Sequence, residues 1–111
     1  MSERAEKAIN YIRDKAEEFA RAKSNRVHLE QFRKSKKAML VQMAPEACKT
    51  AQAKESYAYA HEDYVQLCEG LREAVFAEEK LRYEIEAARL RFEQWRTQEA
   101  NGRAERQRYG A

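Results

Sequence analysis

The sequence predicts an all-α protein: a long antiparallel helical hairpin of two long helices and a short connecting helix. Only 3 of its 111 residues are Gly and 1 is Pro, while 37% are charged and 43% are apolar. A chain so poor in turn residues does not form a turn-rich β fold. Its commonest residues are strong helix formers, and its apolar residues recur at spacings of three and four.

The first long helix is predicted over about residues 3–43. Ser2 is a suitable N-cap, and Glu3 and Glu6 lie where the helix dipole favours acidic side chains. Pro45 fits the first turn of a helix and not its interior, so the stretch Ala44-Pro45-Glu46 ends this helix and permits a new start.

The apolar residues of this first helix divide into two faces. At 100° per residue, the second face is rotated from the first by roughly 140°, whereas a heptad stripe drifts only about 20° per heptad. We interpret this as a change of packing partner, between the same chain and a second subunit, or as a local break near Ser24-Asn25. The first face comprises Ala5, Ile9, Ile12, Ala16 and Phe19, and the second Ala22, Leu29, Phe32, Met39, Leu40 and Met43.

The rest of the chain is predicted to form a short helix and a second long one. The short helix covers about 46–58, and the stretch SYAYAHED marks a kink or a new N-terminus. The long helix then runs over about 62–101 and ends at Asn101-Gly102, with 103–111 as a frayed polar tail. We expect a single helical domain over residues 1–105.

The second long helix has a coiled-coil-like seam with one irregular step around Glu78. Its members are Tyr64, Leu67 or Cys68, Leu71, Val75, Glu78, Leu81, Ile85, Ala88, Phe92 and Trp95. A lone pair of long helices has little interior, so we expect assembly into an oligomeric helical bundle. The expected oligomer interface comprises Ile9, Ile12, Phe19, Leu81, Ile85, Phe92 and Trp95.

Positive charge is concentrated in the first half of the chain. Residues 1–60 hold 13 Lys+Arg and 8 Asp+Glu, a net of +5, whereas residues 61–111 hold 9 and 11, a net of −2. On a helical projection, five cations fall within an arc of roughly 100° that points away from Leu29 and Phe32. With Lys36, they form a candidate nucleic-acid-binding site: Lys23, Arg26, Arg33, Lys34, Lys36 and Lys37. The simpler alternative is a solvated helix face on which Glu30 relieves the charge of Arg26 and Arg33.

Catalytic and metal-binding patterns are not recognisable in the sequence. The chain has two histidines, no Glu-x-x-His pair, and two cysteines (Cys48 and Cys68) that are far apart. It has no Gly-rich phosphate loop and no nucleophile motif. We therefore expect a non-enzymatic protein without metal or cofactor. No run of 18 apolar residues and no signal-peptide core occurs, so we expect a cytoplasmic protein without membrane contact.

Two long stretches of the chain resemble a known family. They are KAINYIRDKAEEFARAKSNRVHLEQFRKSKKAML and SYAYAHEDYVQLCEGLREAVFAEEKLRYEIEAARLRFEQWRTQEANGRAE, and AYAH, EGLREAV, EEKLR and RFEQWR are their most specific parts. The stretches resemble small, uncharacterised helical proteins of tailed bacteriophages and prophages, encoded near recombination and replication genes. This resemblance implies the cytoplasm of an infected bacterial host and a neighbourhood of recombination proteins. It carries no catalytic or binding residues.

Two functions are consistent with these features. The first is an accessory role in phage DNA recombination or replication, in which an oligomer of this chain binds single-stranded DNA, or a DNA-bound recombination protein, through the basic residues. The second is a protein–protein module that inhibits or redirects a host nuclease or defence complex without touching DNA. Salt-dependent binding of oligonucleotides would distinguish the first from the second.

Overall fold

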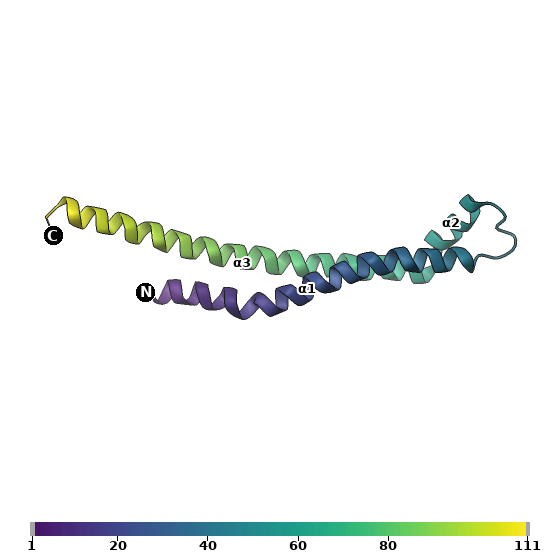
Figure 1. Ribbon diagram of the computed structural model, residues 1–111, viewed down its shortest axis with the longest axis horizontal. Helices are drawn as coiled ribbons and strands as arrows, with labels where there is room; N and C mark the ends of the chain where they lie inside the picture. Colours follow the sequence, from purple (N-terminus) through teal and green to yellow (C-terminus); the bar gives the residue numbers. More distant parts are fainter. Residues whose placement is uncertain (1, 111) are drawn as a thin grey trace. The chain divides into compact units, whose positions relative to one another are not determined.

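The computed structural model describes residues 2–110 and confirms the all-α hairpin. Over those residues the chain forms three helices and no strand (Figure 1). The helices are α1 (Glu3–Gln42), α2 (Ala51–Ala60) and α3 (Glu62–Arg108). The two long helices are joined by the short one, as the sequence predicts. None of the helices within this range is both long and apolar enough to cross a membrane.

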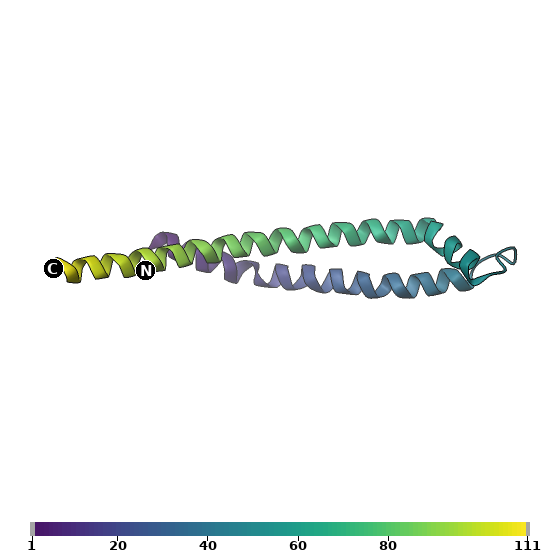
Figure 2. The ribbon, with the colours of Figure 1, turned by 90° about the horizontal axis from the view of Figure 1, so that it is seen from above.

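The chain divides into two compact units, and the single domain over residues 1–105 stays a prediction. Unit 1 combines the first half of α1, up to Phe19, with α3 from Glu79 onward, and unit 2 comprises Ala20–Glu78. In each unit a segment of α1 lies beside a segment of α3 that runs in the opposite direction (Figures 1 and 2).

α1 begins and ends where the sequence predicts. The Oγ of Ser2 accepts a hydrogen bond from the Ala5 N–H at 3.1 Å, so Ser2 caps the helix. The helix ends at Gln42, three residues before Pro45. It is continuous through Ser24-Asn25, so the predicted alternative of a local break there is wrong.

One regular heptad seam runs along α1, and the two rotated apolar faces predicted from the sequence are wrong. The seam residues follow one another at alternating spacings of three and four, and all of them are buried or half-buried. Most of the positions between them are exposed. The seam comprises Ala5, Ala8, Ile12, Lys15, Phe19, Ala22, Arg26, Leu29, Arg33, Lys36 and Leu40. Several of its members are cations. When only apolar residues are counted, the seam is interrupted there, and this interruption produces the apparent rotation.

The seam of α3 is regular as well. Ala74 is 6% exposed and Val75 is 40% exposed, so Ala74 and not Val75 occupies the seam. With Ala74, the spacing of three and four continues through Leu71, Glu78 and Leu81, and the predicted irregular step around Glu78 disappears. Val75 is more apolar than Ala74, so hydrophobicity alone assigns the wrong one of these two neighbours to the seam.

Capping explains where α2 begins and α3 ends. The side chain of Thr50 accepts a hydrogen bond from the Ala53 N–H at 3.0 Å, so α2 begins at Ala51 and not near residue 46. α3 continues through the predicted stop at Gly102 to Arg108. A glycine inside a helix costs only about 1 kcal/mol, and the residues that follow it, 103–108, are all good helix formers. Gly110, with a φ of 76°, follows the actual end.

The residues predicted to form an oligomer interface all belong to unit 1. Leu81 is buried within the single chain, and the other six are half-buried: Ile9, Ile12, Phe19, Ile85, Phe92 and Trp95. Nearby, the Tyr11 hydroxyl donates a hydrogen bond to Glu84 at 2.8 Å and joins α1 to α3. Contacts within one chain therefore already cover most of these side chains, and self-association through them stays a prediction.

Candidate interaction surface in unit 2

A buried ion pair lies on the seam of unit 2. The Arg26 guanidinium donates two hydrogen bonds to Glu78, from Nε to Oε2 at 2.5 Å and from Nη2 to Oε1 at 3.1 Å. Its Nη1 also donates to Glu30 at 3.0 Å. Glu78 is 1% exposed. Burial of a carboxylate is unfavourable, and here the hydrogen bonds from charged donors offset its loss of hydration. These bonds, first those to Glu78 and then those to Glu30, raise the pKa of Arg26 above its usual value.

Two lysines of the predicted nucleic-acid-binding site are paired as well. The Lys36 ammonium lies 3.5 Å from Asp63 at the start of α3. The Lys37 ammonium lies 3.5 Å from Glu55 on α2 and 4.6 Å from the centre of the Tyr59 ring. Its hydrogen bond with Tyr59, more than the charge of Glu55, raises the pKa of Lys37. These contacts join α1 to both of the other helices.

The prediction that the basic arc points away from the hairpin is therefore wrong for two of its residues, Arg26 and Lys37, and Lys36, the sixth residue of the candidate site, is paired as well. The physical reason is their seam position or its immediate neighbourhood: long side chains there can lie along the partner helix and reach its carboxylates. Arg33 is half-buried on the same seam. Lys23 and Lys34 are exposed, and neither forms an ion pair with another residue of the range 2–110. Nucleic-acid binding by the six residues stays a prediction.

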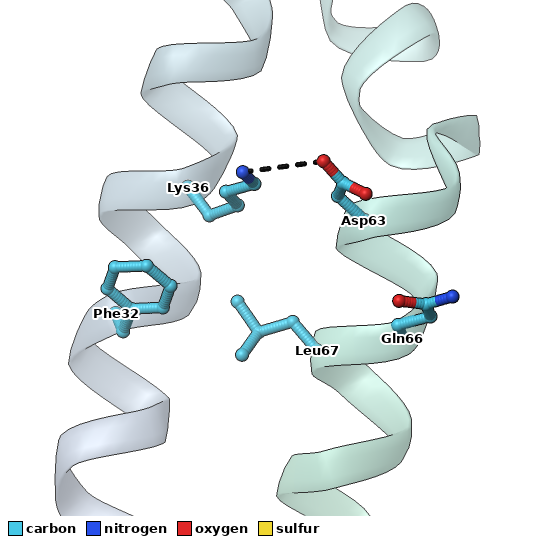
Figure 3. A pocket seen from close by; sticks show the side chains of 5 residues that line it. All are labelled: Phe32, Lys36, Asp63, Gln66 and Leu67. Carbon is cyan, nitrogen blue, oxygen red and sulfur yellow. Dashed lines mark ion pairs between the residues drawn. The ribbon is translucent and has the colours of Figure 1, made fainter.

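An open groove lies between α1 and α3 of unit 2 (Figure 3). It has a volume of about 310 Å³ and is lined by Phe32, Lys36, Asp63, Gln66 and Leu67. The side chains form two levels, because each wall carries residues four apart and the helices are antiparallel. Figure 3 shows the Lys36–Asp63 ion pair at one level, and Phe32 opposite Leu67 at the next.

The α1 wall of the groove continues as an exposed apolar face. Phe32 is 41% exposed, Met39 50% and Met43 63%. Met43 lies one residue beyond the end of α1, but its N–H still bonds to the Met39 carbonyl as in a helix. At 100° per residue the three side chains therefore lie within about 40° of one another. His28 extends the face in the other direction, with its ring stacked on Phe32 at a centroid distance of 6.0 Å. Water-exposed aromatic and methionine side chains in one row are typical of protein-binding surfaces.

The groove was not predicted from the sequence. Its signal was present, because Phe32 lies between seam positions Leu29 and Arg33 and its projection falls at the edge of the seam. The position of Phe32 at the edge of the seam can be recognised only after the charged residues are assigned to the seam. The acidic partners Glu78, Asp63 and Glu55 were missed for the same reason.

The cysteine and histidine side chains of residues 2–110 do not form a metal site. Residues 2–110 contain no group of three or more His, Cys, Asp or Glu side chains placed to hold a metal ion. Cys48 and Cys68 are both free and half-buried. His61 serves a structural purpose, since its Nδ1 accepts a hydrogen bond from the Asp63 N–H at 3.0 Å in the first turn of α3.

Comparison with protein families, with curated proteins and with solved structures finds no match to this chain. The resemblance to helical proteins of tailed bacteriophages therefore stays a prediction. The function must be inferred from the geometry of the two units.

Proposed function

We propose that this protein acts by binding a protein partner, and that the groove of unit 2 is the docking site. The single observation that carries the proposal is the exposed Phe32 beside a groove lined by one ion pair and one apolar pair. An apolar anchor surrounded by polar groups is the usual composition of a protein-binding hot spot. The pairing of Arg26, Lys36 and Lys37 supports the same choice, because it leaves fewer cations for a polyanion.

Affinity capture with a matched control tests this proposal. The bait proteins are the wild type, Phe32→Asp in the groove, and Tyr83→Asp as a control at an exposed aromatic of unit 1. We expect a stoichiometric protein captured from source cells by the wild type and the control, lost with Phe32→Asp, and retained after nuclease treatment. Equal capture by the wild type and Phe32→Asp, or capture that is lost after nuclease treatment, would contradict the proposal.

A second candidate function is binding to a nucleic-acid backbone as an accessory in phage DNA recombination or replication. The observation that favours it is the pair of exposed lysines, Lys23 and Lys34, which form no ion pair within residues 2–110. Such side chains can neutralise phosphates, and each phosphate contact contributes a slope of about −0.7 to log K against log salt for a single strand.

Titration with a labelled single-stranded oligonucleotide at low and moderate salt tests this second candidate. We expect Lys23→Glu/Lys34→Glu to weaken binding by about tenfold or more and to flatten the salt dependence. The control is Lys7→Glu/Lys80→Glu, which reverses two exposed cations of unit 1. Equal affinity of the two double variants would remove the second candidate.

A further inference from the structure

The groove of unit 2 is complementary to itself. Its α1 wall carries Lys36 at one level and Phe32 at the next, and its α3 wall carries Asp63 and Leu67 at the same two levels. Figure 3 shows these two levels directly. One level thus pairs a cation with an anion across the groove, and the other pairs two apolar side chains.

A two-fold axis along the groove uses this arrangement. It places the α1 wall of one copy over the α3 wall of another and keeps every side chain at its own level. Lys36 of each copy then faces Asp63 of the other, so two ion pairs become an alternating ring of four charges. Phe32 of each copy lies over Leu67 of the other, which covers the exposed ring. Contacts of this kind are isologous and close at two subunits.

The other two-fold arrangement is unfavourable. An axis perpendicular to both helices would place α1 over α1, with either Lys36 opposite Lys36 or Lys36 opposite Phe32. The first juxtaposes like charges, and the second places Lys36 over a ring and not over a carboxylate of the other copy, so neither forms the intermolecular ion pairs of the first arrangement. Charge complementarity therefore selects the arrangement in which both hairpins point the same way.

The apolar face of α1 gives this contact more extent. Met39 and Met43 are half or more exposed and follow Phe32 along the same face. From Phe32 to Met43 the face spans about 16 Å at 1.5 Å per residue. Few side chains of unit 2 are buried within one copy: Leu40, Ala58, Leu71, Ala74 and Glu78. A second hairpin would convert this two-helix layer into a four-helix core.

We infer that the groove of unit 2 docks a second copy of this chain, through Phe32, Lys36, Asp63 and Leu67, with the two hairpins parallel. The inference rests on the proposed function of the groove and names its occupant. It differs from the interface predicted from the sequence, because all seven residues of that interface lie in unit 1.

Charge reversal in separate copies tests the inference. Lys36→Glu gives a copy with two acidic walls, and Asp63→Lys gives a copy with two basic walls. We expect the wild type to be a dimer by light scattering at ~100 μM, where a standard homodimer interface is occupied. Each variant alone is expected to be monomeric, with its dimer constant weakened by about tenfold or more. An equimolar mixture is expected to regain the dimer, because both pairs across the interface are then complementary.

Folding does not obscure this result, since the Lys36–Asp63 pair is partly exposed and its loss within one copy costs little. Phe32→Asp is expected to give a monomer, and Tyr83→Asp to leave the dimer intact. A monomeric wild type would overturn the inference. So would a wild-type dimer whose molar mass is unchanged by Phe32→Asp and by both charge reversals. If that monomer still captures a protein in a Phe32-dependent manner, only the identity of the occupant is wrong. If it captures none, the docking function is wrong as well.

Discussion

Unit 1 and unit 2 use the same heptad seam but fill it with different side chains. In unit 1 the buried seam residues are apolar: Ala5, Ala8, Leu81 and Ala88. In unit 2 the seam also buries apolar residues (Leu40, Leu71 and Ala74), but it includes Arg26, Arg33, Lys36 and the buried carboxylate of Glu78, whereas the seam of unit 1 has one half-buried cation, Lys15. The difference teaches that position in the heptad, and not hydrophobicity, decides which side chains of these helices face each other.

The apolar and the charged seam residues have different physical effects on the helix pair. Apolar side chains stabilise a helix pair in proportion to the area they cover, but they tolerate a shift of one helix along the other. A buried guanidinium is satisfied only where a carboxylate lies opposite, as Glu78 lies opposite Arg26. We therefore expect unit 1 to supply apolar burial and unit 2 to set the register of the hairpin.

The largest expected effect comes from breaking the charged seam. Arg26→Leu removes the guanidinium from Glu78, which is 1% exposed, and we expect the free energy of unfolding to fall by more than in any of the variants that follow. Arg26→Leu/Glu78→Leu should recover most of this loss, because an apolar pair can replace a buried ion pair. Denaturant unfolding of both variants provides the measurement. A double variant no more stable than the single one would show that the charges are not coupled.

The next effect tests the register of α3 on the seam. Ala74→Leu adds volume at a buried position, and we expect a loss of about 2 kcal/mol from overpacking. Val75→Leu makes a similar change at an exposed position and should stay within about 0.5 kcal/mol of the wild type. Thermal melts of the pair provide the measurement. Equal destabilisation by the two changes would restore the irregular step that the sequence predicted around Glu78.

Alkaline pH should weaken both units through different residues. Hydrogen bonding to Glu84 raises the pKa of Tyr11 above its usual 10.0, and bonding to Tyr59 raises that of Lys37 above 10.5. A raised pKa means that the protonated form is favoured by folding, so the added stability is present below the usual pKa. It is lost as the pH rises through the folded value.

Melting temperatures measured from neutral pH to above pH 10.5 check this expectation, since 10.5 is the usual pKa of Lys37. Tyr11→Phe should flatten the alkaline decline near the Tyr pKa, and Lys37→Met should flatten it at higher pH. A decline that neither substitution changes would mean that these two bonds do not contribute.

The smallest effects concern the two glycines inside α3. A Cβ at Gly70 would meet no atom within 4 Å, and one at Gly102 would make an ordinary 3.5 Å contact with Arg106. We expect Gly70→Ala to raise the free energy of unfolding by roughly 0.5–1 kcal/mol, and Gly102→Ala by less, because the end of a helix frays. The same denaturant melts measure both. A larger gain at Gly102 would contradict this order.

The fold was predictable from the sequence, but the site was not. Breaker content, the Ser2 cap and Pro45 suffice to place two long helices and the end of the first. The seam was lost in unit 2 because Arg26, Arg33 and Lys36 were treated as solvent-facing on account of their charge. The carboxylates that pair with Arg26 and Lys36 lie 52 and 27 residues away along the chain, and such pairing depends on helix register, which spacing within one helix does not reveal. The groove depends on the same register.

The most direct test of the charged seam is the nitrogen-15 NMR signal of the Arg26 Nε–H group. A 2.5 Å hydrogen bond to a buried carboxylate predicts a resonance shifted away from those of the exposed arginines and a proton that exchanges slowly with water near neutral pH. Glu78→Gln should move this signal towards the others and speed its exchange. A wild-type Arg26 signal that already overlaps with those of the exposed arginines and exchanges rapidly would contradict the account.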